Sequence, residues 1–216
     1  MVGKANLTRD IASYRARAGR FDLVTVPPLA YLMVDGAGDP NTVPAYSEAV
    51  ASLFPLAYAL KFHQKRERGL DHVVMPLEGL WWAEDMAAFT SARDKDRWSW
   101  TLMILTPPWT TSEDVDAARG TVSAKGGAPR LPDVRWETLD EGPCVQTLHV
   151  GPYDAEGPVL ARMHDEVIAG RGLRPTGRHH EVYLSDARRT APERLRTILR
   201  QPVGAAASGP GEVSGP

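Results

Sequence analysis

The order of strand-like and helical segments is the feature of this sequence that most constrains its fold. The first half contains one strand-like run, a long helical pattern and two more strand-like runs, at residues 21–34, 44–68, 71–83 and 97–105. The second half opens with a strand-like run at 134–139 and then gives the same order, at residues 144–150, 154–169, 179–185 and 195–203. Each half therefore reads strand, helix, strand, strand, and this mixture predicts an α+β fold.

The length of the chain, 216 residues, allows one large domain or two small ones. Residues 121–132 are weakly patterned and separate module one, about residues 21–108, from module two, about residues 133–203. Each module alone is small for a stable core, so we expect a single domain over residues 21–203 with a seam between its halves. Residues 1–20 form an amphipathic lead-in, and residues 204–216 are expected to be a flexible tail.

Two helix starts can be placed from their capping residues. Ser112 precedes two acids, Glu113 and Asp114, which suit the positive end of a helix dipole, so Ser112 is the expected N-cap. Asp154 is the expected N-cap of the helix that ends before Gly170.

Composition and charge exclude several classes of function. The net charge is −2, which gives no basic field for holding nucleic acid. The single cysteine, Cys144, cannot form an internal disulfide, and the six histidines show no metal-ligand spacing, so neither a metal nor a cofactor is expected. No secretory signal and no apolar stretch long enough for a membrane span is found, which predicts a soluble, cytoplasmic protein.

Two glutamates interrupt otherwise apolar strands. Glu78 lies among Val, Leu and Trp, and Glu181 lies beside Tyr183 in the second module. A strand glutamate most often faces solvent, but the matching positions of these two in both halves favour a shared cleft. If they face one cleft, repulsion and burial would leave one carboxyl protonated and the other ionised, as acid–base catalysis requires.

Aromatic residues gather on and beside the same strands. A tryptophan on a strand usually fills the core, but flat rings near carboxylates are also how proteins hold planar or cationic hydrophobic ligands. Trp81 and Trp82 are adjacent and must point to opposite faces of their strand. The expected ligand-binding residues are Trp81, Trp82, Trp98, Trp100, Trp136, Tyr153, Tyr183 and His179.

Several strings of residues, taken in order, resemble the GyrI-like small-molecule-binding family over about residues 21–203. The strings are PLEGLWW at 76–82, WSWTLMI at 98–104, HVGPY at 149–153, HEVYLSD at 180–186 and LRTILRQPV at 195–203.

The resemblance implies two pseudo-twofold-related strand–helix–strand–strand modules with an aromatic-walled ligand cleft between them. The same fold forms the effector-binding domain of multidrug-responsive transcription activators, where a cleft glutamate meets hydrophobic cations. Free-standing members include hydrolases that open the cyclopropane ring of DNA-alkylating natural products. Glu181 matches the family's cleft glutamate, Glu78 matches its counterpart in the first module, and Tyr153 matches the tyrosine of the GPY turn.

Three functions follow as alternatives. The leading one is a protein that encloses a hydrophobic aromatic small molecule and hydrolyses a strained cyclopropane, with Glu181 or Glu78 as general base, for detoxification or drug resistance. The second is a module that sequesters such molecules, or senses them for a partner protein, without turnover. The third, direct inhibition of a topoisomerase, is suggested by the family name but gains no support from the near-neutral charge.

Overall fold

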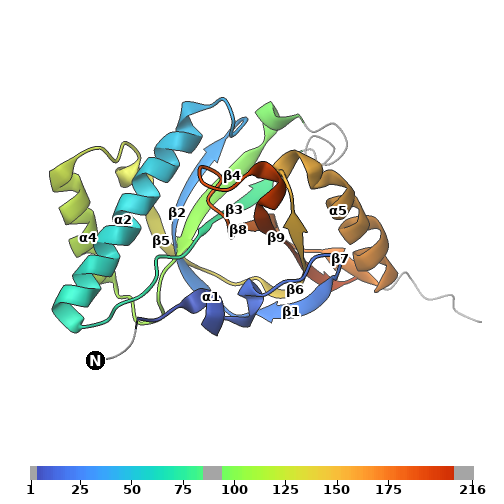
Figure 1. Ribbon diagram of the computed structural model, residues 1–216, viewed down its shortest axis with the longest axis horizontal. Coiled ribbons are helices and arrows are strands. Elements are labelled where there is room, and N and C mark those ends of the chain that lie inside the picture. The colour runs from blue at the N-terminus through green and yellow to red at the C-terminus, as the bar shows by residue number, and fades with distance from the viewer. Residues whose placement is uncertain (1–3, 85–93, 207–216) are drawn as a thin grey trace, which may run out of the picture.

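The computed structural model describes residues 4–84 and 94–206, and among these residues the strands form one antiparallel sheet of nine strands (Figure 1). The strands are β1 (Asp22–Val26), β2 (Leu29–Ala37), β3 (Leu77–Trp82), β4 (Ser99–Leu105), β5 (Arg135–Leu139), β6 (Gly142–Val150), β7 (Leu173–Pro175), β8 (His179–Tyr183) and β9 (Arg196–Ala205). The order across the sheet is β1-β6-β9-β8-β3-β4-β2-β5, with β7 paired to β9.

The sheet contains the two modules that the sequence predicts. Module one is β2, α2 (Pro44–Arg68), β3 and β4, and module two is β6, α5 (Gly157–Ala161, continued as a π-helix over Arg162–Ile168), β8 and β9. In both modules the third strand lies between the other two, and the second strands, β3 and β8, pair at the centre of the sheet. The α+β class and the two-module architecture are thereby confirmed.

Exchanged edge strands join the modules into one body. β1 precedes module one in the chain but pairs with β6 of module two, and β5 precedes module two but pairs with β2 of module one. Only Pro27 and Pro28 separate β1 from β2, although these strands lie near opposite ends of the order. A link of two residues spans about 11 Å at most, so the sheet must curl until its ends approach one another.

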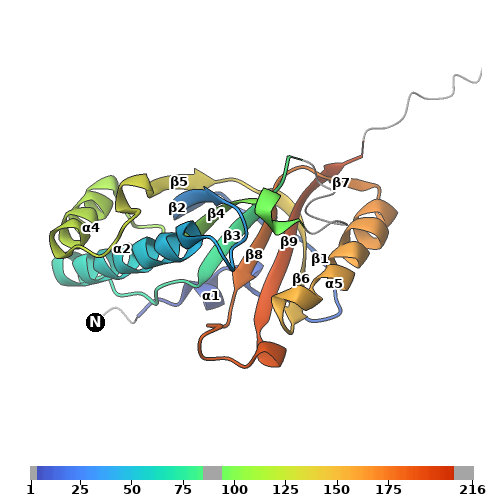
Figure 2. The same cartoon turned by 90° about the horizontal axis from the view of Figure 1, so that it is seen from above.

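Helix α2 and the helix formed by α5 and its π-helical continuation cover the same face of the sheet and lie toward opposite ends of the molecule (Figures 1 and 2). On α2, a buried stripe packs on module one, and it consists of Ala49, Leu53, Leu56, Ala57 and Leu60. On the α5 side, a smaller cluster holds Val145, Met163, Ile168, Leu199 and Val203. We call this side the helix face.

The opposite side of the sheet is covered in part by the N-terminal segment, and we call it the N-terminal face. This segment contains α1 (Leu7–Asp10) and a 3-10 turn over Ala12–Tyr14, and both Leu7 and Tyr14 are buried in the main core. The amphipathic lead-in is therefore an integral part of the fold, because its apolar side chains pack against the sheet.

Local differences from the sequence expectations have physical causes. Helix α4 (Ser112–Lys125) is capped by Thr111 instead of Ser112, because the Thr111 hydroxyl and the Asp114 carboxylate bond each other's backbone N–H groups in a capping box. The N-cap of α5 is Glu156, since residues 153–155 form a separate 3-10 turn. β9 continues to Ala205, two residues into the expected tail, and residues 207–216 lie outside the described part.

Within residues 4–84 and 94–206, no helix is both long and apolar enough to cross a membrane.

Candidate ligand-binding site

The register of the two central strands separates the predicted pair of glutamates. Gly79 lies opposite Glu181 across β3 and β8, and Glu78 lies opposite Val182. Residues directly opposite each other share a face, and neighbours along a strand point to opposite faces. Glu181 therefore lies on the helix face and Glu78 on the N-terminal face, so the expectation that both line one cleft is wrong.

Glu181 lies at the centre of the helix face, with 9% of its surface exposed. Its Oε2 accepts a hydrogen bond of 2.8 Å from the Tyr183 hydroxyl, and that hydroxyl accepts a bond of 2.9 Å from the Trp81 indole N–H. The chain of bonds crosses the seam, because Trp81 belongs to module one and the other two residues to module two. A buried carboxylate thus accepts a hydrogen bond from one neutral donor, Tyr183, which is in turn bonded by the other module.

Further aromatic rings surround this centre from three elements. Tyr46, in the first turn of α2, stacks on Trp81 at 6.3 Å between ring centroids. Trp98, just before β4, meets Trp81 edge-on at 5.7 Å. Tyr153, in the turn before α5, meets Tyr183 edge-on at 5.6 Å and is 36% exposed. Such edge and offset contacts are the preferred geometry of aromatic pairs.

His179 completes the group on the side of module two. It is 3% exposed, and its Nε2 lies 3.6 Å from Oε1 of Glu181. The two residues are two positions apart on β8, so both side chains point to the helix face.

The tyrosines beside Glu181 are held in their neutral form. Burial and the negative charge of Glu181 raise the pKa of Tyr183 well above its ordinary value. Burial, Glu156 and Glu181 raise the pKa of Tyr153 to about 12, and burial with Glu181 raises the pKa of Tyr46. All three hydroxyls therefore remain able to donate a hydrogen bond at neutral pH.

Two glycines make room for the tryptophans of this face. A Cβ on Gly79 would lie 2.7 Å from the Trp81 indole nitrogen and 3.1 Å from the Tyr183 hydroxyl. A Cβ on Gly36 would lie 2.0 Å from the Trp100 ring, which instead lies directly over that backbone. Any larger residue at either position would push a ring off the sheet.

The structure thus brings six of the predicted residues together and leaves four apart. The six are Glu181, His179, Trp81, Trp98, Tyr153 and Tyr183. Trp100 shares the helix face but is fully buried beneath Tyr46, with its indole N–H bonded to the Gly38 carbonyl at 3.3 Å. Trp82 is on the other face under the Arg178 guanidinium at 3.5 Å, and Trp136 is on the edge strand β5, bonded to Thr106.

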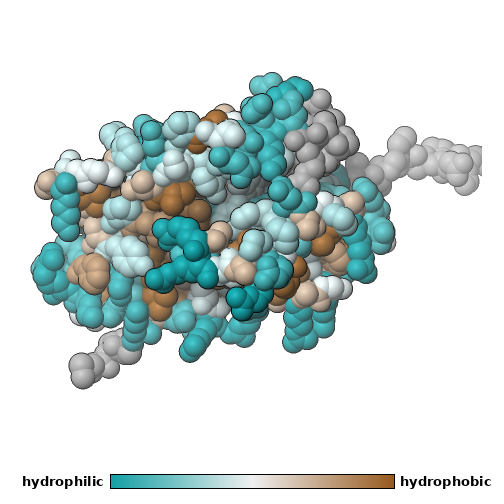
Figure 3. Space-filling model, turned by 45° about the horizontal axis from the view of Figure 1, so that its top comes forward, coloured by the Kyte–Doolittle hydropathy of each residue, from teal (hydrophilic) through white to brown (hydrophobic). Residues whose placement is uncertain are grey.

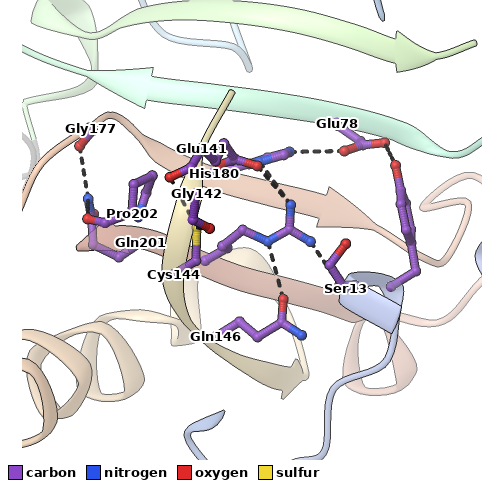
Figure 4. Close-up of polar contacts among 12 residues, drawn as sticks. Ser13, Glu78, Glu141, Gly142, Cys144, Gln146, Gly177, His180, Gln201 and Pro202 are labelled. Carbon is purple, nitrogen blue, oxygen red and sulfur yellow. Dashed lines mark hydrogen bonds and ion pairs between the residues drawn. The ribbon is translucent and has the colours of Figure 1, made fainter. Parts of the chain in front are cut away.

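The fourth separated residue, Glu78, belongs to a buried polar network on the N-terminal face (Figure 4). It is fully buried, accepts a hydrogen bond from the Tyr14 hydroxyl, and lies 3.0 Å from Nε2 of His180. Nδ1 of His180 lies 2.9 Å from Glu141, which also pairs with Arg200 at 3.0 Å.

Arg200 connects this network to β6 and to the N-terminal segment. The fully buried guanidinium donates to Gln146 at 3.2 Å and to the Ser13 backbone carbonyl at 2.8 Å. The network therefore links β3, β6, β8, β9 and the N-terminal segment.

The charges of the network balance when His180 is protonated. Each ring nitrogen faces a carboxylate, and only the doubly protonated imidazolium can donate to both. Burial disfavours this charge, but Glu141 and Glu78 outweigh burial and raise the pKa of His180. Burial likewise opposes ionisation of Glu141, but His180 and Arg200 lower the pKa of Glu141 to about 2. Glu78 is therefore part of a buried structural network.

Sequence reasoning missed Tyr46, although a signal was present. Tyr46 begins the spacing of three and four residues that continues through Ala49, Leu53, Leu56 and Leu60 on the buried stripe of α2. In the structure this end of the stripe meets the sheet at Trp81 of the central strand β3.

No group of three or more His, Cys, Asp or Glu side chains in the described ranges is arranged to hold a metal ion.

Several solved structures are similar to this chain in sequence and fold. A conserved protein from Listeria innocua is 35% identical, with a TM-score of 0.84 over 93% of this chain and 100% of the other. A hydrolase from the same organism is 33% identical, with a TM-score of 0.82 over 94% of this chain and 100% of the other. The C-terminal domain of EcmrR shares the fold, at 10% identity and a TM-score of 0.52 over 87% of this chain and 98% of that domain.

A search of curated proteins returned no match. The sequence model of the GyrI-like small molecule binding domain matches residues 20–203, which include both modules and every residue of the helix-face site. The chain belongs to the GyrI-like small molecule binding family.

Proposed function

We propose that the chain binds flat, hydrophobic cations on the helix face, with Glu181 as their charge partner. The observation that carries this proposal is a buried carboxylate surrounded by aromatic rings from both modules. Within the described residues, no lysine or arginine forms an ion pair with Glu181, and its hydrogen-bond donor is the neutral Tyr183. A cation is attracted both to the carboxylate and to the faces of the rings, most strongly where water is excluded.

A charge-matched pair of probes tests this binding. N-methylacridinium and 9-methylanthracene have nearly the same shape and differ in charge, and tryptophan quenching reports their affinity. Loss of the Glu181 charge in Glu181→Gln is expected to weaken the cation about 30-fold, in line with the effect of removing one partner of a buried charge pair, and to leave the neutral probe unchanged. The exposed Glu166→Gln is the matched control. Equal affinity of both probes for the unmodified protein would refute the proposal.

We further propose that the same carboxylate acts as a general base in hydrolysis. Support comes from the 33% identical protein described as a hydrolase, which is matched over its whole length. The proposed substrate is an electrophilic cyclopropane conjugated to an aromatic carbonyl, the class that the family resemblance implies. Water would lie between Oε1 of Glu181 and the ring carbon, while the neutral hydroxyl of Tyr153 would be the donor to the product oxygen.

The proposed step is the net addition of one water molecule. Glu181 takes a proton from the water molecule, and at the same time the water oxygen forms a bond to the cyclopropane carbon. The strained C–C bond breaks, and its electron pair moves into the ring system and leaves a phenolate oxygen, which a tyrosine hydroxyl stabilises by a hydrogen bond. The phenolate then takes a proton from solvent and Glu181 returns its own. General-base assistance contributes about 10²–10⁴-fold to such a step.

Mass spectrometry of a spirocyclopropyl alkylating compound after incubation with the protein tests turnover. We expect a product heavier by one water, formed about 10²–10⁴-fold more slowly by Glu181→Gln and at the unchanged rate by Glu166→Gln. Unchanged turnover by Glu181→Gln would refute the role of this carboxylate. Saturable quenching without any product would instead identify a sequestering protein, the alternative that the sequence left open.

A further inference from the structure

A groove on the outer side of module one lies apart from the helix-face site. It has a volume of about 470 Å³ and runs between α2 and α4. Its walls are Pro55, Tyr58 and Phe62 of α2 and Val122 and Lys125 of α4. Helix α4 follows β4 and is not part of either strand–helix–strand–strand module, so this groove is an addition to the two-module fold.

The groove exposes two large aromatic side chains to solvent. Tyr58 is 49% exposed and Phe62 is 54% exposed. They are one helical turn apart, and their rings stack at 6.5 Å with an interplanar angle of 26°. Apolar surface rimmed by polar residues marks interaction sites, where aromatic residues are enriched. Figure 3 shows hydrophobic surface among hydrophilic residues on the end of the molecule where α2 and α4 lie.

The charged residues that line the groove have one sign. Arg66 and Lys125 line it, beside His63, whose Nε2 lies 3.5 Å from Asp114, and no carboxylate is among the lining residues. Arg66 pairs with Glu67 at 2.6 Å, but both side chains are more than half exposed, and such surface pairs contribute little. Lys65 and Arg68, at the same end of α2, are paired with Asp71 and Asp114, so the positive charge at the groove comes from Arg66 and Lys125. The groove therefore complements an apolar anchor that is flanked by negative charge.

We propose that this groove is a docking site for an acidic segment of a partner protein that inserts an aromatic or aliphatic side chain between α2 and α4. The concave shape favours an inserted side chain over a flat lipid surface, which meets protruding residues. The basic rim disfavours a second copy of the same patch, because two such rims would repel each other across a twofold interface.

A library of random twelve-residue peptides displayed on phage, selected on the full chain, tests the proposal. We expect enriched peptides with one aromatic or large aliphatic residue beside at least two acids. Synthetic versions should bind Phe62→Ser and Lys125→Glu at least 10-fold more weakly than the unmodified chain, and more weakly as salt rises. Leu23→Ser is the matched control, because Leu23 is 55% exposed on β1, in neither cluster of core residues, and should leave binding unchanged.

Three outcomes would overturn the proposal. Enrichment of peptides without acids, or of peptides that bind Phe62→Ser and the unmodified chain equally, would remove the groove as an acidic-segment site. A dimer in solution that Phe62→Ser converts to a monomer would assign the groove to a second copy. Sedimentation with vesicles of anionic lipid that depends on Phe62 would assign it to a membrane surface.

Discussion

The two faces of the central sheet hold one buried strand glutamate each, and their surroundings differ sharply. On the N-terminal face, Glu78 contacts an imidazolium and a tyrosine hydroxyl within a charge-balanced network. On the helix face, Glu181 accepts a hydrogen bond from a tyrosine hydroxyl and lies 3.6 Å from the His179 ring, with no lysine or arginine of the described residues paired to it. The same residue type, one step apart in register on neighbouring strands, lies in a network with a buried arginine on one face and beside aromatic residues on the other. The face of the sheet, and not the residue type or its apolar neighbours, decides the surroundings of each glutamate.

The largest expected effect comes from the same substitution on both faces. Glu78→Gln leaves the His180 imidazolium without one carboxylate in a site closed to water, and should lower the free energy of unfolding by about 3–5 kcal/mol. Glu181→Gln removes a charge that is paired with no lysine or arginine of the described residues, and should change this free energy by less than about 1 kcal/mol. Urea unfolding followed by tryptophan fluorescence measures both values. Equal losses would show that the two glutamates have similar structural roles.

The dependence of stability on pH should reflect the N-terminal face. The pKa of Glu141 falls from 4.5 to about 2 on folding, so its contribution, about 3 kcal/mol, is present above pH 4.5 and is lost as the pH falls toward 2. The pKa of His180 is raised, so its contribution is present below 6.5 and is lost as the pH rises through the folded value.

Urea midpoints between pH 2 and pH 9 measure this dependence. Glu141→Gln should flatten the acid limb, whereas Glu181→Gln should leave it as in the unmodified protein. If Glu181→Gln flattened the acid limb and Glu141→Gln did not, the assignment of the charge network to the N-terminal face would be contradicted.

A smaller effect is expected from paired tyrosine substitutions, since each glutamate accepts one tyrosine hydroxyl. Tyr14→Phe leaves the fully buried Glu78 short of a donor and should cost about 2 kcal/mol of unfolding free energy. Tyr183→Phe removes the donor to Glu181 and the acceptor of the Trp81 indole N–H, and should cost about 1 kcal/mol, because Glu181 is 9% exposed and water can replace the hydroxyl. Differential scanning fluorimetry measures the melting temperatures of the two variants. A larger decrease for Tyr183→Phe than for Tyr14→Phe would contradict the expected order.

Much of the fold followed from local patterns in the sequence. The helical pattern at residues 44–68 corresponds to α2, and the strand-like runs correspond to eight of the strands, because hydrophobic period and Pro or Gly boundaries act over a few residues. The start of β3 was placed too early, since residues 71–76 have strand-like composition but pair with no strand beyond the bridge between His72 and Ala5. Pairing partners several dozen residues away determine where such a run becomes a strand.

The site was only partly predictable for the same reason. The grouping of Glu181, Trp81 and Tyr183 followed from the sequence, because a period of two puts their side chains on defined faces of the strands. The grouping of Glu78 with Glu181 failed, because one residue of register between β3 and β8 moves a side chain to the opposite face. Tyr46 enters the site from a helix whose packing position the strands alone do not specify.

The α+β class, the two modules and the residues of the proposed site could be predicted from the sequence, because they depend on composition and short-range periodicity. Which glutamate lies beside the aromatic residues, and which is enclosed with His180, Glu141 and Arg200, became clear from the folded arrangement. That choice depends on long-range strand register and on how the N-terminal segment covers one side of the sheet.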